Sequence, residues 1–333
     1  WDMSVVYPGL DSGEFDAAMA DTIEEIAGLV EVFEEHSIGA ASSPEVDDRV
    51  VRVFEIVVSR LNAAFTKGYA LDAYIHGFIT TDTTNEQAQA NSSELNQHWL
   101  KVQLLDARLT AWLGSLDVDA LVAQSSVAAD HEFMLRRAKV EAEHLMSAEE
   151  EALATELSLT GRTAWQKLYG NFTSQLVVDL DLDGKVEEHP MSAIRNFAYS
   201  PSREVRRKAY EAELDAWETA AVPVAAALNS VKGEMNTLSA KRKWASPLDQ
   251  ALHGNNMDRA SLDAMMTAAR ESFPHFRRYL RAKAKAIGVD RLAWYDLFAS
   301  VSADTAEWRY ADAEAFILEQ FGTYSPEMQN LAA

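Results

Sequence analysis

Apolar residues recur at the spacing of an α-helix along almost the whole 333-residue chain, and this pattern restricts the fold more than any other feature. Residues three or four positions apart lie on the same face of a helix, so each such stretch predicts a helix with one buried side. The two clearest stretches contain Phe15, Met19, Ile23, Ile26, Val30 and Phe33, and then Val46, Val50, Phe54, Val57, Leu61 and Phe65. Further patterns at 95–112 and 128–145 bring the expected number to four helices before residue 146, which suits a bundle of helical hairpins.

Serine–proline pairs mark several expected helix starts, because a serine hydroxyl caps the first amides and proline suits the first helical position. The pairs are Ser43–Pro44, Ser200–Pro201, Ser246–Pro247 and Ser325–Pro326. Ser147 and Glu150 have the spacing of a capping box, and a helix is expected from there to about Leu157. A long helical pattern at 201–243 contains Pro223, which removes one amide donor and predicts a kink or a break.

One segment has the alternation of a β-hairpin rather than helical spacing. Apolar and acidic residues alternate over 176–182, a turn is expected at Asp183–Gly184, and a second strand follows. Residues 294–298 are either a short strand or a buried helical turn, because so short a pattern does not separate the two. The predicted fold class is mainly α. A helical hairpin region at 1–116 leads through a hinge within 117–126 to a region at 117–333 that carries the hairpin near 176–188.

The chain is strongly acidic, with 52 Asp and Glu against 30 Lys and Arg and a formal net charge of −22. This charge opposes binding to phosphate backbones and anionic lipids, so neither nucleic acid nor a membrane is expected as a partner. The acidic residues are spread along the chain. A solvated surface explains them best, and a cleft that favours cationic peptides is the alternative.

Composition also limits the cofactors and the compartment. No cysteine is present, so disulfides and thiolate metal sites are excluded and any metal needs His, Asp or Glu as ligands. No run approaches the roughly 18 apolar residues of a membrane span. The opening WDMSVVYPGLDSGEF lacks the basic and apolar parts of a secretory signal, which favours a cytoplasmic location.

No set of residues with the spacing of a known catalytic site occurs in the sequence. A zinc peptidase helix needs H-E-x-x-H, in which two imidazoles on one helix face hold the metal and the Glu activates water. The nearest string begins at His131–Glu132 and has Leu135 where the second His would stand. His144 with Glu141 and Glu143 would make a weak acidic metal site, although surface histidines in charged helices are far commoner. Glycine-rich phosphate loops and a Gly-x-Ser-x-Gly elbow are also absent, so no catalytic, cofactor-binding or metal residue is predicted.

Three weaker candidates have a more ordinary explanation. The acidic segment 179–184 resembles a calcium loop but lacks its later Glu, so a charged strand edge explains it better. Tyr295 and Asp296 form the most suggestive polar pair, but a catalytic role is not expected of them. Several aromatic residues would suit a peptide channel, although most are expected in the core: Trp165, Tyr169, Phe172, Trp217, Trp244, Trp294 and Tyr295.

The amino-acid sequences of several segments resemble those of bacterial oligoendopeptidase F-type enzymes, which are relatives of thimet oligopeptidase. The opening WDMSVVYPG is similar to the W-D-L-S-x-L-Y-P-G start of that family. The stretch 192–298 is similar to the segment before the family's zinc site, notably in SAIRNFAYSPSREVRRKAYEAELDAWE and FPHFRRYLRAKAKAIGVDRLAWYDLF. The resemblance implies a largely helical, two-lobed ellipsoid around a deep channel in which zinc-dependent hydrolysis of short peptides takes place.

The same resemblance also implies that this chain lacks the catalytic residues of the family. The family holds zinc by the two His of H-E-x-x-H and a later Glu, and none of these residues occurs here. We therefore expect the N-terminal part of a zinc-dependent oligoendopeptidase, supplying channel wall and inactive alone. A large apolar face would be exposed where the catalytic half docks. The alternative is a non-enzymatic helical module that binds peptides or proteins, and a polar, capped C-terminal end would favour it.

Overall fold

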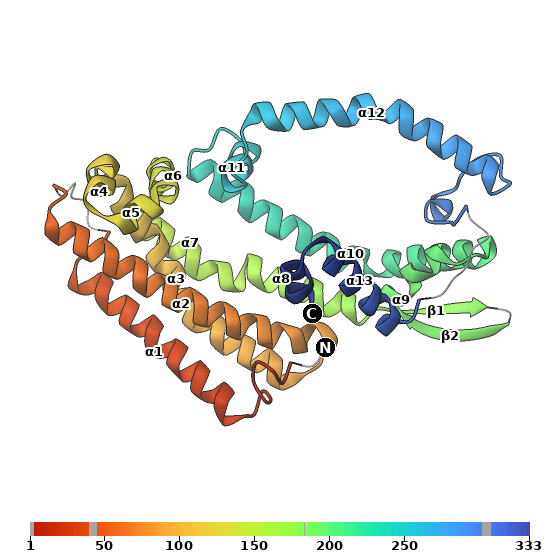
Figure 1. The fold of residues 1–333 in the computed structure, drawn as a ribbon, viewed down its shortest axis with the longest axis horizontal. Coiled ribbons are helices and arrows are strands. Elements are labelled where there is room, and N and C mark those ends of the chain that lie inside the picture. Colours follow the sequence, from red (N-terminus) through yellow and green to blue (C-terminus); the bar gives the residue numbers. More distant parts are fainter. Residues whose placement is uncertain (1–2, 40–44, 183, 302–307) are drawn as a thin grey trace.

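The computed structural model describes residues 3–39, 45–182, 184–301 and 308–333, which are mainly helical (Figure 1). The helices are α1 (Gly13–Glu35), α2 (Asp48–Thr81), α3 (Glu86–Ser115), α4 (Val118–Gln124), α5 (Ser126–Asp130), α6 (Glu132–Ala142), α7 (Ala148–Thr160), α8 (Arg162–Ser174), α9 (Met191–Asn196), α10 (Arg203–Lys241), α11 (Pro247–Gly254), α12 (Arg259–Ala286), α13 (Tyr310–Tyr324) and α14 (Pro326–Ala332). Two 3₁₀ turns, η1 (Phe197–Tyr199) and η2 (Trp294–Asp296), and two strands, β1 (Val177–Leu182) and β2 (Lys185–Pro190), complete the described elements.

Helices α1, α2 and α3 pack side by side and contain most of the core (Figure 1). Their starts follow from capping: Ser12 accepts a hydrogen bond from the Phe15 amide at 3.2 Å, and Asp47 accepts from the amides of the first turn of α2. The apolar stripes then meet in two clusters of buried side chains. Phe33 and Phe54 lie in the larger cluster, and Tyr74 lies in the smaller one near the start of α1.

A close approach of α2 and α3 depends on a glycine. A Cβ at Gly68 would lie 2.3 Å from Cζ3 of Trp99, well inside van der Waals contact. The Trp99 ring in turn packs edge-on against Phe65, with ring centroids 5.4 Å apart. The glycine thus sets the spacing of the two helices at the point where Trp99 is held.

The hairpin forms a third, smaller core with the start of α10. Strands β1 and β2 pair antiparallel, with Val177 opposite Pro190 and Leu182 opposite Lys185. Val178 and Leu180 point to one face and are buried against Met191 and other apolar residues of α9 and α10. The tight connection uses Gly184 at φ 82°, a conformation that favours glycine.

The second half of the chain is long and thinly packed. Helix α10 runs unbroken through Pro223 and bends near its middle, and α12, which contains Pro274, runs apart from α1, α2 and α3 (Figure 1). Of the residues in α12, Lys283 and Ala284 are buried. Helices α8, α13 and α14, each described over its full length, contain no buried residue. The apolar residues of this half therefore remain largely exposed.

Most predicted elements are confirmed, and some differ for local reasons. The helical patterns, the hairpin and the capping box of Ser147 and Glu150 are all present. Helix α10 is capped by Ser202 instead of Ser200, whose hydroxyl accepts a hydrogen bond from the Ser202 amide at 3.3 Å. Ser43–Pro44 and Asp183 lie outside the described residues.

Two short segments, 294–298 and 117–126, differ from the expected structure or leave it open. Residues 294–296 form the 3₁₀ turn η2, so the strand alternative for 294–298 is wrong. The hinge expected within 117–126 contains α4, whose Val118 and Leu121 are buried in the main core with α1 and α2. The division of the chain at residue 116 stays a prediction.

Candidate functional site

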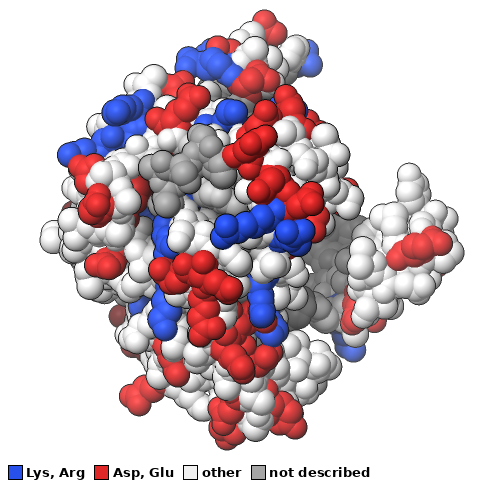
Figure 2. All heavy atoms as spheres, turned by 90° about the vertical axis from the view of Figure 1, so that its left-hand side faces the viewer, with Lys and Arg blue, Asp and Glu red and all other residues white. Residues whose placement is uncertain are grey.

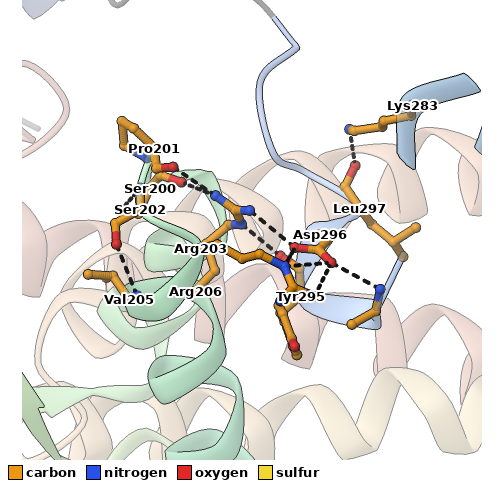
Figure 3. Close-up of polar contacts among 11 residues, drawn as sticks. Ser200, Pro201, Ser202, Arg203, Val205, Arg206, Lys283, Tyr295, Asp296 and Leu297 are labelled. Carbon is orange, nitrogen blue, oxygen red and sulfur yellow. Dashed lines mark hydrogen bonds and ion pairs between the residues drawn. The ribbon is translucent and has the colours of Figure 1, made fainter. Parts of the chain in front are cut away.

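Asp296 is the centre of a buried ion-pair cluster that joins the chain after α12 to the start of α10 (Figure 3). Its carboxylate accepts hydrogen bonds from Arg203 at 3.0 Å, from Arg206 at 3.1 Å and from the amide of Ala293 at 3.0 Å. The Asp296 side chain is fully buried and that of Arg206 nearly so, whereas Arg203 is half-exposed. Lys283 adds a further link by donating to the carbonyl of Leu297 at 2.6 Å.

The charges in this cluster favour an anchoring role over an acid–base role. Burial pushes the pKa of Asp296 upward, but the hydrogen bonds from Arg203, the Ala293 amide and Arg206 outweigh it, so the pKa lies below its usual value. A carboxylate held ionised with both oxygens engaged is a poor proton carrier near neutral pH. The neighbouring Tyr295 has its ring under the guanidinium of Arg203, 5.1 Å from the ring centroid. The pair that the sequence singles out therefore holds α10 and η2 together.

A second polar cluster joins α6 to α11. Nε2 of His253 lies 2.9 Å from Oε1 of Glu141, which also accepts from Arg137 at 2.9 Å. His144 stacks on Trp244 with ring centroids 3.6 Å apart, and its Nδ1 donates to the carbonyl of Arg242 at 3.0 Å. Glu141 and His144, which the sequence groups as a weak candidate, do lie near each other here, but both are committed to protein partners.

A buried carboxylate, Glu151, links α7 to the end of α10. Arg242 donates to both of its oxygens, at 3.0 and 2.6 Å, and the amide of Met146 donates at 3.1 Å. The partners are 91 residues apart in the chain, and nothing in the helical periodicity points to them. Sequence reasoning missed this pair for that reason.

Two adjoining cavities lie beside this pair. The first, of about 340 Å³, lies among α2, α3, α7 and α10 and is lined by Phe65, Trp99, Asp106 and Glu234, among others. The second, of about 250 Å³, is lined by residues that include Glu141, His144 and His253. Asp106, Gln103, Thr155 and Arg242 border both cavities. The two cavities together expose polar and aromatic side chains from several helices to one open region.

Asp106 is the most perturbed carboxyl group of this region. Asp106 is exposed to the solvent of the cavities, with protein atoms close around it. Burial raises its pKa, with the negative charge of Glu141 adding to the effect, Arg242 opposing it and Glu151 adding a little more. Within the described residues Asp106 makes no hydrogen bond and no ion pair. Sequence reasoning did not single it out, because a lone Asp on a helix carries no pattern.

The residues present do not fit a peptidase zinc site. Among the described residues no group of three or more His, Asp or Glu is placed to hold a metal ion, and H-E-x-x-H does not occur in the sequence. His131 directs its Nδ1 to the carbonyl of Val127 at 2.7 Å, and Glu132 pairs with Arg136. No step of a reaction is therefore assigned to a metal held by these residues.

The seven aromatic residues that the sequence assigns mainly to the core are not fully buried. Trp294 is 70% exposed and Tyr169 is 47% exposed, and the other five are half-buried. The expectation of a core position is wrong because α8, α10 and η2 are covered on one side, leaving their remaining faces open. Of the aromatic residues of α8, Tyr169 lies on an uncovered face, and Trp165 and Phe172 are partly covered.

Helix α12 presents a long, uncovered apolar face. Its exposed apolar residues are Met265, Met266, Phe273, Phe276 and Tyr279. Spacings of three and seven positions place Met266, Phe273 and Phe276 on one side of the helix. No described element packs extensively on α12. In contrast, the face of the molecule in Figure 2 carries acidic and basic side chains interspersed with each other.

Comparisons with known proteins agree on one family. The family model described as Oligopeptidase F matches residues 113–177, which run from the end of α3 to the start of β1. Oligopeptidase PepF of Bacillus subtilis (strain 168) is 21% identical over 281 residues, which are 83% of this chain and 41% of that protein. The crystal structure of oligoendopeptidase-F from Enterococcus faecium superimposes with a TM-score of 0.70 at 16% identity, covering 94% of this chain and 60% of that one.

These likenesses support the expected resemblance and the mainly α fold. The chain spans less than two thirds of the length of each of these relatives. The segment matched by the family model lies before 192–298 and includes Glu141 and Glu151 of the polar clusters. No helix in the described residues is long and apolar enough to cross a membrane.

Proposed function

We propose, from its resemblance to oligoendopeptidase F in sequence and fold, that this chain forms one wall of the peptide channel of a zinc-dependent oligoendopeptidase. The complete enzyme hydrolyses short peptides, and this chain is inactive alone. One observation carries the proposal: the fold matches an oligoendopeptidase F over 94% of the chain, yet the sequence contains no H-E-x-x-H. Zinc and the groups that activate water then belong to sequence outside these 333 residues.

The distribution of buried residues supports a role as a wall. The stable core lies among α1, α2 and α3, whereas α12 and α13 expose their apolar residues. Isolated domains rarely leave so many aromatic side chains uncovered, and such faces mark sites of association. The partner proposed for the α12 face is the catalytic part of the same enzyme, and short peptides are the substrates of the whole.

The docking role of α12 is tested by the association state of the purified chain. In the absence of its partner the uncovered face should bind hydrophobic dyes and drive concentration-dependent self-association, measured by sedimentation velocity. Replacing Phe273 and Phe276 by Ser should reduce both, and because both side chains are exposed, thermal stability should hardly change.

A matched control separates this face from exposed apolar residues in general. Phe133 on α6 is 67% exposed, comparable to Phe276 at 62%, but lies on a helix that packs on α3. The F133S variant should associate like the unmodified chain. A monomeric unmodified chain, or equal association of the F273S/F276S variant and the unmodified chain, would contradict a docking role for α12.

A further inference from the structure

The cavity of about 340 Å³ has the features of a ligand site that the proposed channel role does not use. Small-molecule sites have typical volumes from about 300 Å³ and combine apolar walls with a few polar groups. Here Leu61 and Phe65 of α2, Trp99 of α3 and Leu238 of α10 supply the apolar wall. Asp106 and Glu234 supply carboxylates from α3 and α10.

Both carboxylates have unused hydrogen-bonding capacity. One oxygen of Glu234 accepts from the amide of Arg162 at 2.8 Å and so caps α8, but the other is buried and has no partner among the described residues. The side chain of Asp106 has no hydrogen-bond or ion-pair partner among the described residues. A buried carboxylate oxygen without a partner is costly, so a donor or a cation beside Glu234 would be stabilised strongly. Asp106 is exposed to the solvent of the cavity and adds its charge from the cavity wall.

The basic groups of the cavity do not satisfy these oxygens. Arg242 is engaged by Glu151 through two hydrogen bonds, which leaves it a poor partner for Asp106. Arg162 is exposed and its guanidinium makes no ion pair within the described residues. In the adjoining cavity Glu141 is taken up by Arg137 and His253. Two carboxylates of the cavities, Asp106 and Glu234, therefore have no basic side chain as partner in the described part of the chain, and the exposed Arg162 is the cation left near them.

The aromatic wall suits the same chemistry. Phe65 and Trp99 line the cavity, and a cation near an aromatic face is attracted by the negative charge density of the ring. The aliphatic part of an alkylamine would pack on the apolar wall while its charged end meets a carboxylate. The carboxylates of Asp106 and Glu234 line this cavity and that of Glu141 lines the adjoining one, and their negative charges disfavour anionic ligands.

We propose that this cavity binds an alkyl chain ending in an ammonium or guanidinium group, with Asp106 and Glu234 as its partners and Phe65 and Trp99 as its wall. The bound group is the end of a basic peptide side chain or a free alkylamine, which share this chemistry. The inference stands on the cavity alone and does not require the proposed peptidase role.

The test is titration of the purified chain with pentylguanidinium, pentylammonium and neutral 1-pentanol, followed by calorimetry and by ligand-observed NMR. The two cations should bind and pentanol at least about tenfold more weakly, as expected when a charge-assisted hydrogen bond is lost. D106N and E234Q should each weaken cation binding by at least about tenfold. The amide oxygen introduced by E234Q can still accept from the Arg162 amide, so this variant keeps its fold.

Two further variants make the result specific. R162Q removes the competing cation and should strengthen binding by about two- to fivefold. D263N, which changes an exposed Asp on α12 far along the chain, should have no effect. Thermal unfolding of each variant verifies that the chain is folded.

The source of the group is decided with a blocked tripeptide, acetyl-Gly-Arg-Gly-amide, and its citrulline counterpart. Binding of the Arg peptide over the citrulline peptide identifies a peptide side chain, and binding of the alkyl cations without the peptide identifies a free amine. The proposal is overturned if neither cation binds, if pentanol binds as well as they do, or if D106N and E234Q bind like the unmodified chain.

Discussion

Replacing Asp296 by Asn should cost about 3 kcal/mol of unfolding free energy at pH 7. The substitution keeps the size of the side chain and one acceptor for the Ala293 amide, but it leaves the buried guanidinium of Arg206 without a countercharge. Breaking a buried ion pair from one side costs about 3–5 kcal/mol. The half-exposed Arg203 adds less than about 1 kcal/mol, and the retained hydrogen bonds place the total near the lower limit.

Urea denaturation measures the global loss, and hydrogen exchange of amides 283–298 measures local opening of the anchor. Glu204 provides the control, since it also pairs with an Arg of α10 but both groups are exposed to solvent. E204Q should therefore cost less than about 1 kcal/mol. Similar losses of stability in D296N and E204Q, together with equal exchange rates of amides 283–298 in the two variants, would contradict an anchoring role for Asp296.

The effect of D296N should also depend on pH in a definite direction. The pKa of Asp296 is lowered in the folded chain, so its contribution is complete above the unfolded value of about 3.9 and is lost as pH falls through the folded value. The difference in stability between D296N and the unmodified chain should therefore be constant from about pH 5 to 7 and shrink below about pH 4. A difference that grows on acidification would contradict this assignment.

Three substitutions test the packing and capping of other elements. G68A should destabilise by about 1–3 kcal/mol, because its Cβ would meet Trp99, whereas G170A, with open space around it, should be neutral or stabilising; urea midpoints compare the two. L71A should cost about 2–5 kcal/mol in the same assay, because Leu71 is fully buried in the cluster near the start of α1, and a loss below about 1 kcal/mol would argue against that core. S147A should cost about 0.5–2 kcal/mol by removing the cap of α7, and unchanged exchange of its first-turn amides would refute the capping role.

Much of the fold could be predicted from the sequence because helical patterns are local. The stripes beginning at Phe15 and Val46 predict α1 and α2, and Ser147 with Glu150 predicts the start of α7, since each signal depends on residues within one or two turns. The hairpin was equally visible through alternation and the turn before Lys185.

The polar clusters and cavities could not be found in this way. Asp296 meets Arg203 across 93 residues and Glu151 meets Arg242 across 91, and such contacts follow from how helices pack. Ser200 has the local signature of a helix cap, but its hydroxyl accepts from the Ser202 amide and α10 begins two residues later, with Ser202 as its cap. The predicted core position of the aromatic residues was wrong for a related reason. Burial of a side chain depends on which helix faces other elements cover, and the local pattern does not show this.

The most direct test of the proposed function is hydrolysis of a quenched fluorescent peptide, roughly ten residues long, by the purified chain. The assay is run with added zinc, with and without a chelator. The account predicts no chelator-sensitive turnover, because no described group of residues is placed to hold a metal ion. Chelator-sensitive turnover that follows the chain through purification and is lost in H144A or H131A variants would contradict it.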